Sequence, residues 1–194
     1  MTAAAIEPSV QRAVYSPALI ALHWLTAATF VAIFATVEAH GYWPKGDPTR
    51  VFLMDMHKSL GLTILLLVLV RMFVRSRTIA PRITPPLATW QIASAHIVHT
   101  TLYAAMLSMP LLGWLMSDAA GRPVPFFAWE LPAIIGENKD LGRTLRSIHE
   151  FIGSALYWVI GLHAFAALAN HYVLRNNTLP RMLPFLRQRH DIRS

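Results

Sequence analysis

The chain has 194 residues, of which 55% are hydrophobic and only 14% are charged, a composition that excludes an ordinary soluble domain and indicates a membrane protein. Its formal net charge of +7 does not point to nucleic acid, because most basic residues flank apolar stretches, where we expect them to contact anionic lipid headgroups. The absence of cysteine excludes disulfides, thiolate-bound iron–sulfur clusters and covalently attached c-type haem.

Four apolar stretches follow one another along the chain, at about residues 17–37, 54–74, 90–116 and 148–173. Each reaches the roughly 20 residues that a helix needs to cross about 30 Å of hydrocarbon. The first resembles a secretory signal in length, but the opening MTAAAIEPSV lacks the basic region of such signals, so we expect it to stay attached. The sequence therefore predicts an all-α fold, a single-domain bundle of four transmembrane helices.

The basic residues predict the orientation of this bundle. One side, which includes both termini, carries ten Lys or Arg residues: Arg12, Arg71, Arg75, Arg77, Arg82, Arg175, Arg181, Arg187, Arg189 and Arg193. The other side carries seven: Lys45, Arg50, Lys58, Arg122, Lys139, Arg143 and Arg146. Because the more basic side of a membrane protein faces the cytoplasm, we expect both termini there.

The two outer connections differ in length. The first, HGYWPKGDPTR, has the glycine, prolines and aspartate of a turn region. The second, about residues 117–146, mixes prolines with aromatic residues and is the longest stretch outside the predicted spans. We expect it to lie on the membrane surface as a cap, with a short helix of its own near residues 138–146.

Histidines are concentrated in the predicted spans. Six of the nine fall inside them: His23, His57, His96, His99, His149 and His163. Ionisable side chains are costly in a bilayer and usually face the interior of a bundle, where they serve a function. A single one of these histidines would be explained by an interhelical hydrogen bond, but six together indicate ligands.

The spacing of the histidines predicts two sites. His149 and His163 are 14 residues apart, so on a helix they lie about 21 Å apart along the axis and within about 40° of the same face. His57, at the outer start of the second span, matches the depth of His149. At the inner level His23 matches His163, and His99 remains the alternative to His23.

Two imidazoles at each level suit a haem that is ligated on both faces. Zinc would require three or four ligands close together. A haem with both axial positions filled by histidine has no open position for a substrate, so its chemistry is one-electron transfer.

These residues resemble the bacterial cytochrome b561 family across nearly the whole chain. The matching segments are LHWL, MHKSLG, AHIVHTTLYAAMLSMPLLGW, IHEFIGSALYWVIGLHAFAALANHY and NNTLPRMLP. The resemblance implies a bacterial inner-membrane protein that holds two b haems on four histidines, namely His23, His57, His149 and His163. It also implies ubiquinone as electron acceptor and, in one branch, superoxide as the donor at the outer face. Asn170 departs from the pattern, since some relatives have a second histidine before His171.

Further residues are candidates for substrate contacts. His171, near Tyr172 and Arg175 at the inner surface, can supply a hydrogen bond and a proton to a quinone, or belong to an ordinary interfacial cluster. Lys58, beside His57, can attract an anion such as superoxide, although the outer segments carry eight acidic residues against seven basic ones.

Three arginines near the membrane surfaces, Arg71, Arg75 and Arg146, are candidates to bind haem propionates, because guanidinium groups pair well with carboxylates. The simpler interpretation is that they are flanking charges that set topology.

Two other functions remain open. The chain can be a haem-bearing membrane anchor that passes electrons between a partner dehydrogenase or hydrogenase and quinone, or a haem-free transporter or structural bundle in which the histidines serve proton transfer or packing. A colourless preparation would support the second and exclude both haem interpretations.

Overall fold

The computed structural model describes residues 14–186 and confirms the prediction of four long helices. In chain order the elements are α1 (Pro17–His40), α2 (Pro48–Ser76), α3 (Thr89–Ala119), β1 (Val124–Phe126), β2 (Trp129–Leu131) and α4 (Lys139–Tyr172). Each helix contains an 18-residue window whose mean hydropathy lies between 1.2 and 2.0, so all four are long and apolar enough to cross a membrane. α1, α2 and α3 extend beyond the spans that the sequence predicted, and α4 begins at Lys139, well before its predicted start.

The helices begin where local capping groups allow. Ser16 and Asp47 cap α1 and α2, and each is followed by proline in the first turn. At α4 the side chain of Asn138 accepts a hydrogen bond of 3.0 Å from the amide of Leu141. The prediction of a separate short helix near residues 138–146 is wrong, because this segment is the first part of α4 and continues into the span without a break.

A close contact holds the beginning of α4 against the end of α3. The amide of Asn138 donates a 2.9 Å hydrogen bond to the carbonyl of Ala119. A Cβ on Gly142 would lie 3.3 Å from the backbone of Ala119, so only glycine permits this approach without displacement. Sequence periodicity could not reveal this, since the contact joins two elements.

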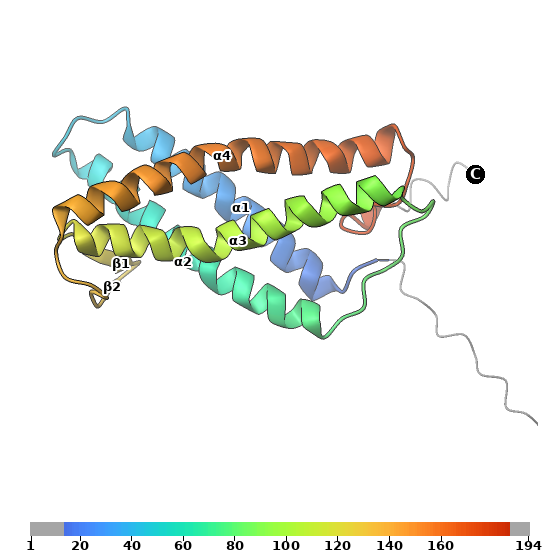
Figure 1. Cartoon of the computed structure of the whole chain (residues 1–194), viewed down its shortest axis with the longest axis horizontal. Coiled ribbons are helices and arrows are strands. Elements are labelled where there is room, and N and C mark those ends of the chain that lie inside the picture. The colour runs from blue at the N-terminus through green and yellow to red at the C-terminus, as the bar shows by residue number, and fades with distance from the viewer. Residues whose placement is uncertain (1–13, 187–194) are drawn as a thin grey trace, which may run out of the picture.

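The bundle is built from helix pairs. α1 packs along α2, α3 along α4, and α2 along α3, whereas the described residues show no comparable backbone packing between α1 and α4. The α1–α2 connection and the β1–β2 hairpin lie at one end of the bundle, on the left of Figure 1, and the α2–α3 connection lies at the other. We call these the hairpin end and the terminal end.

The middle of the bundle is filled by apolar side chains. Ile64 and Val68 of α2 and Met106 of α3 are buried together, and Phe30 and Ile33 of α1 pack against them. This cluster separates the hairpin end from the terminal end with a layer that contains no charge among its members. It therefore provides a low-dielectric barrier between the two levels of histidines.

A folded cap closes the hairpin end. The strands β1 and β2 pair antiparallel, with Phe126 opposite Trp129, and Phe127 adopts a left-handed turn conformation with φ of 54°. The buried hydroxyl of Ser59 on α2 accepts a 2.9 Å hydrogen bond from the amide of Phe127, and its oxygen lies within donating distance of the carbonyls of Asp55, at 2.9 Å, and Pro125, at 3.2 Å. The segment thus folds over the hairpin end of the bundle, but its hairpin was not predicted, and its place on the membrane surface stays a prediction.

The terminal end is held by the segment that follows α4. The guanidinium of Arg181 is buried and donates hydrogen bonds to the hydroxyl of Tyr15 and to the carbonyl of Pro81. Burial lowers the pKa of Arg181 below its usual value. Trp24 of α1 donates its indole N–H to the carbonyl of Met182 at 2.9 Å. These bonds join the start of α1, the α2–α3 connection and the C-terminal segment.

Four of the basic residues used to predict orientation, Arg12, Arg187, Arg189 and Arg193, lie outside the described residues.

Candidate functional site

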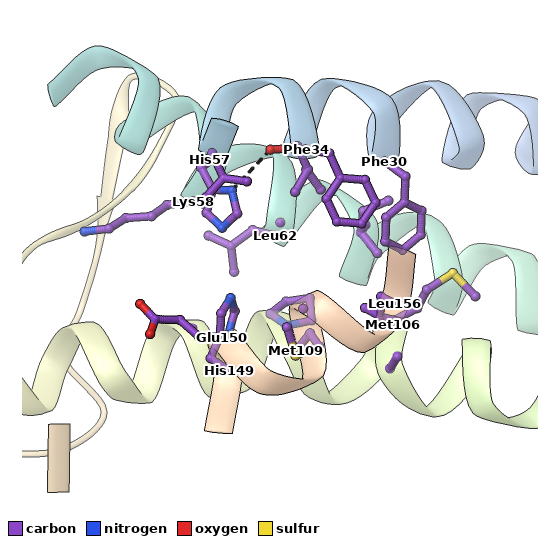
Figure 2. Close-up of a pocket in the computed structure, with 18 of the residues that line it drawn as sticks. Phe30, Phe34, His57, Lys58, Leu62, Met106, Met109, His149, Glu150 and Leu156 are labelled. Atoms are coloured by element: carbon purple, nitrogen blue, oxygen red, sulfur yellow. Dashed lines mark hydrogen bonds between the residues drawn. The ribbon is translucent and has the colours of Figure 1, made fainter. Parts of the chain in front are cut away.

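Two histidines face each other at the hairpin end. His57 projects from α2 and His149 from α4, and Figure 2 shows the two rings pointing toward one another from opposite walls of a cavity. Their ring centroids are 6.3 Å apart and their planes differ by 71°. Since an imidazole centroid lies about 1.1 Å from its nitrogens, two rings bound at about 2 Å to opposite sides of one metal ion would have centroids about 6 Å apart.

A cavity lies between these rings, and side chains from all four helices line it. Most of the lining is apolar, with Phe30, Phe34 and Met106 toward the middle of the bundle. A Cβ on Gly61, one turn after His57, would meet no atom within 4 Å. The apolar lining therefore suits a flat apolar cofactor, and Gly61 leaves room beside His57.

The surroundings of the two rings hold them in place. The Nδ1 of His57 lies 3.4 Å from the carbonyl oxygen of Ile33 on α1, so an Nδ1–H donates there and leaves Nε2 free to bind a metal. The ring of His149 lies against Gly113, where a Cβ would come within 3.4 Å of Cε1. The buried Nδ1 of His149 has no hydrogen-bond partner, which is unusual in a purely structural core.

Three histidines gather at the second level, nearer the terminal end. His23 of α1 and His163 of α4 have ring centroids 6.2 Å apart with planes 72° apart, nearly the same geometry as the first pair. His99 of α3 is closer to His163, at 5.3 Å. The Nδ1 of His23, like that of His149, is buried and without a partner. The structure brings together all of the histidines that the sequence assigned to the two levels.

Arg71 lies beside this second level. It follows His57 by 14 residues on α2, the same spacing that relates His149 to His163 on α4. Its guanidinium carbon is 5.6 Å from the centroid of the Tyr103 ring, and its positive charge acts on the imidazoles of His23, His99 and His163. α2 thus contributes a histidine to one level and an arginine to the other.

The other two arginine candidates have partners of their own. Arg75 donates to the carbonyl of Thr78 at 2.9 Å, close to the end of α2. Arg146 forms an exposed ion pair of 2.7 Å with Glu150, one turn further along α4. Of the three arginines, the structure places only Arg71 where its charge acts on a set of candidate ligands.

Lys58 lines the same cavity as His57, with its side chain directed toward the mouth opposite Glu150 (Figure 2). Its ammonium group donates a 2.7 Å hydrogen bond to the carbonyl of Pro123 at the edge of the cap. The lysine is therefore held at the mouth by the cap, and the nearby carboxylates of Asp55 and Asp118 act on its charge.

One polar pair in the cavity was not predicted. The hydroxyl of Tyr157 on α4 donates a 2.7 Å hydrogen bond to Glu38 on α1, and both residues line the cavity. The ring of Tyr157 stacks on Phe34 with centroids 4.1 Å apart. The available signal in the sequence was Glu38, an acidic residue near the end of an apolar span. The sequence could not show that Tyr157 is its partner.

His171 lies in the last turn of α4, and its ring meets the edge of Tyr172 at 4.7 Å. Asn170, the departure from the family pattern, shares an amide–amide hydrogen bond of 2.6 Å with the buried Asn176. Here the asparagine stabilises the turn that follows α4. Trp24, at a similar level, already donates its N–H to Met182.

Within residues 14–186, no three His, Asp or Glu side chains come close enough together to hold a bare metal ion. What the structure offers is a pair of imidazoles that face each other across a cavity at the hairpin end, and a second level where His163 lies near His23 and His99. This is the donor set of a six-coordinate haem.

Comparison with known proteins identifies the family of the chain. The chain is 32% identical over 170 residues to cytochrome b561 homolog 1 of Escherichia coli (strain K12). The matched region covers 88% of this chain and 97% of the relative. The chain is also 32% identical over 170 residues to the probable superoxide oxidase CybB of Yersinia pestis, covering 88% and 96%. Cytochrome b561 homolog 2 of E. coli (strain K12) is 25% identical over 170 residues, covering 84% and 87%. Residues 14–185 match the family model of prokaryotic cytochrome b561. The chain therefore belongs to the prokaryotic cytochrome b561 family.

Proposed function

We propose that this protein carries electrons through two b haems, from superoxide or another small donor at the hairpin end to ubiquinone at the terminal end. As a member of its family the chain is a multi-pass protein of the bacterial inner membrane, binds haem b and takes part in membrane electron transfer. The number of haems, their ligands, the donor and the acceptor are the content of the proposal.

The observation that carries the proposal is the match between two ring pairs. His57 and His149 are 6.3 Å apart with planes at 71°, and His23 and His163 are 6.2 Å apart with planes at 72°. Both pairs take one member from α4, where the 14-residue spacing separates them by about 21 Å along the axis. A bundle that used these histidines only for packing would have no reason to repeat one spacing and one angle at two depths.

Each bound haem would supply a centre that takes up and gives up one electron. The residues of the chain do the rest. The Ile33 carbonyl would orient the His57 ring, Gly61 would leave room beside it, and Arg71 would pair with a propionate at the second level. The buried cluster of Ile64, Val68 and Met106 places apolar side chains between the two levels.

We infer that the hairpin end faces outward. The ten-to-seven distribution of Lys and Arg places the termini in the cytoplasm, and with them the terminal end. The cap of β1 and β2 and the mouth of the cavity then face the periplasm. A donor from that side would reach the His57–His149 level first.

The position of Lys58 favours an anion as the electron donor. This lysine is the basic residue among those that line the cavity, and the cap holds its ammonium group at the mouth. In the proposed reaction two superoxide anions each give up one electron and become dioxygen, while one ubiquinone takes both electrons and two protons to become ubiquinol. The relative from Y. pestis carries the name probable superoxide oxidase, which favours superoxide among small donors.

At the terminal end we assign His171 to the quinone. A histidine in the last turn of α4 is at the membrane surface, where it can donate a hydrogen bond to a quinone carbonyl and exchange protons with the cytoplasm. Trp24 is not assigned to this role because its N–H is already bound to Met182.

The experiment that tests the proposal begins with the purified chain in detergent. Haem quantitation should give two haems per chain, and a reduced-minus-oxidised spectrum should show b-type bands. The same purified protein should then consume superoxide in the presence of ubiquinone. His57→Ala should lose one haem and this activity, and Lys58→Gln should raise KM for superoxide, whereas Lys45→Gln in the α1–α2 connection serves as the matched charge control. A colourless preparation would refute the haem assignment, and a two-haem protein that consumes no superoxide would refute the donor.

A further inference from the structure

The hairpin-end cavity is bounded by two helices that hardly touch. Within the described residues α1 and α4 share no backbone packing of the kind that joins the other neighbouring helices. Two side-chain contacts cross this gap beside the cavity. Tyr157 of α4 stacks on Phe34 of α1, and its hydroxyl donates a 2.7 Å hydrogen bond to Glu38, one turn further along α1.

The same stretch of α1 also holds a candidate ligand. Ile33, next to Phe34, offers its carbonyl oxygen to the Nδ1 of His57 at 3.4 Å, as the dashed line in Figure 2 shows. On the other side, Tyr157 follows His149 by about two helical turns on α4. Residues 33–38 of α1 are therefore connected to His57 directly and to the helix of His149 through Tyr157.

We propose that the Tyr157–Glu38 hydrogen bond is a positioning link, which fixes α1 to α4 and thereby keeps the His57 and His149 imidazoles at the spacing and angle that bind haem. This inference rests on the proposed function, because it needs a haem between these two rings. Neither residue is a catalytic group, since their action reaches the haem only through the ligands.

The chemistry of the pair argues for a link and against incidental packing. The stack on Phe34 needs only an aromatic ring, so phenylalanine would serve there as well as tyrosine. The hydroxyl adds one directed bond between α4 and α1, which packing of the ring alone would not require, although Tyr157 is 42% exposed. The other titratable groups that line the cavity are His57, Lys58, His149 and Glu150, and α3 contributes none. Glu38 is therefore the acceptor of the hydrogen bond by which Tyr157 joins α4 to α1.

The test uses the full chain with its haems and three variants of the pair. Tyr157→Phe keeps the stack and removes the hydrogen bond, Glu38→Ala removes the acceptor, and Glu38→Gln keeps an amide oxygen that can still accept from the phenol. Tyr42→Phe is the matched control, because the same hydroxyl is removed from a side chain that is 87% exposed in the α1–α2 connection. Haem transfer to excess apomyoglobin measures retention, and low-temperature electron paramagnetic resonance (EPR) reports the relative orientation of the two axial rings.

We expect Tyr157→Phe and Glu38→Ala to release one of the two haems about tenfold faster, the factor that loss of one hydrogen bond worth about 1.4 kcal/mol implies. The EPR signal of that haem should shift, while the signal of the other haem stays. Glu38→Gln and Tyr42→Phe should behave as wild type in release. The inference is overturned if Tyr157→Phe keeps both release rate and signal, if it weakens both haems equally, or if Glu38→Gln is as defective as Glu38→Ala. If the wild type itself holds no haem, the proposed function fails first, and that result is distinct from these.

Discussion

The imidazole of His57 faces that of His149 with the two ring planes 71° apart, which is close to perpendicular. His23 and His163 repeat this relationship with 72° between their planes. When two axial imidazoles are perpendicular, neither ring plane sets a preferred direction in the porphyrin plane, and two of the iron d orbitals remain close in energy.

We therefore predict that both haems of the oxidised protein give the highly anisotropic low-spin EPR signal with a large maximal g value. The measurement is a cryogenic EPR spectrum of the fully oxidised protein, with spin quantitation against the haem content. A conventional rhombic spectrum from either haem would mean that its rings are nearly coplanar, contrary to the geometry described here.

A second prediction concerns the choice between His23 and His99. The ring of His163 is 6.2 Å from His23, close to the spacing of the His57–His149 pair, but only 5.3 Å from His99, which is too short by about 1 Å for one iron between them. His23→Ala should reduce the haem content from two per chain to one. His99→Ala should keep two, with at most a shifted absorption band.

His96→Ala is the matched control for the His99 variant, because His96 lies three residues earlier on α3 and is exposed. Pyridine haemochrome quantitation of the purified variants decides the matter. If His99→Ala holds one haem while His23→Ala holds two, the assignment of the ligand must be reversed.

The sequence predicted the helices and the two histidine levels because both follow from the regular geometry of a helix. The rise and rotation per residue determine where His149 and His163 lie relative to each other, whatever surrounds them. Hydrophobic length likewise predicts a span without knowledge of its neighbours. These features are local, so a single sequence is enough to find them.

What the sequence did not predict depends on contacts between distant segments. The β1–β2 hairpin is held by Ser59, which lies 68 positions before Phe127. The Tyr157–Glu38 bond joins residues 119 positions apart. The early start of α4 rests on Gly142 against Ala119, and the difference between His23 and His99 depends on how helices tilt. None of these contacts has a periodicity that a pattern could reveal.

A third prediction tests whether the hairpin-end cavity holds the cofactor. Gly61 lines that cavity and an added Cβ there meets no atom within 4 Å, so a side chain at this position can extend into the cavity and should not harm folding. If a haem occupies the space, Gly61→Leu competes with it directly. We expect haem content to fall from two per chain to one while membrane insertion and yield are unchanged.

Gly136→Leu is the control for that substitution, since this glycine in the connection before α4 also has nothing within 4 Å of an added Cβ. It should retain two haems. A Gly61→Leu protein with two haems and unchanged spectra would place the cofactor elsewhere.

The last prediction concerns the direction of electron flow. Arg71 places a positive charge near the second level, whereas the cavity at the hairpin end is lined by one lysine and two acidic residues, Lys58 against Glu38 and Glu150. A positive charge stabilises the added electron of a reduced haem, so the haem near Arg71 should have the higher midpoint potential, and transfer from the hairpin end should run downhill. At an effective dielectric constant near 20 and a separation of about 10 Å, one charge corresponds to roughly 50 to 100 mV.

Arg71→Gln should lower the higher of the two potentials by about this amount in a redox titration, and Arg71→Lys should restore most of it. Arg77→Gln, which removes a guanidinium placed over Phe73 at the end of α2, should leave both potentials within experimental error. If Arg71→Gln leaves the higher potential in place, or lowers both equally, the charge does not set the direction of transfer.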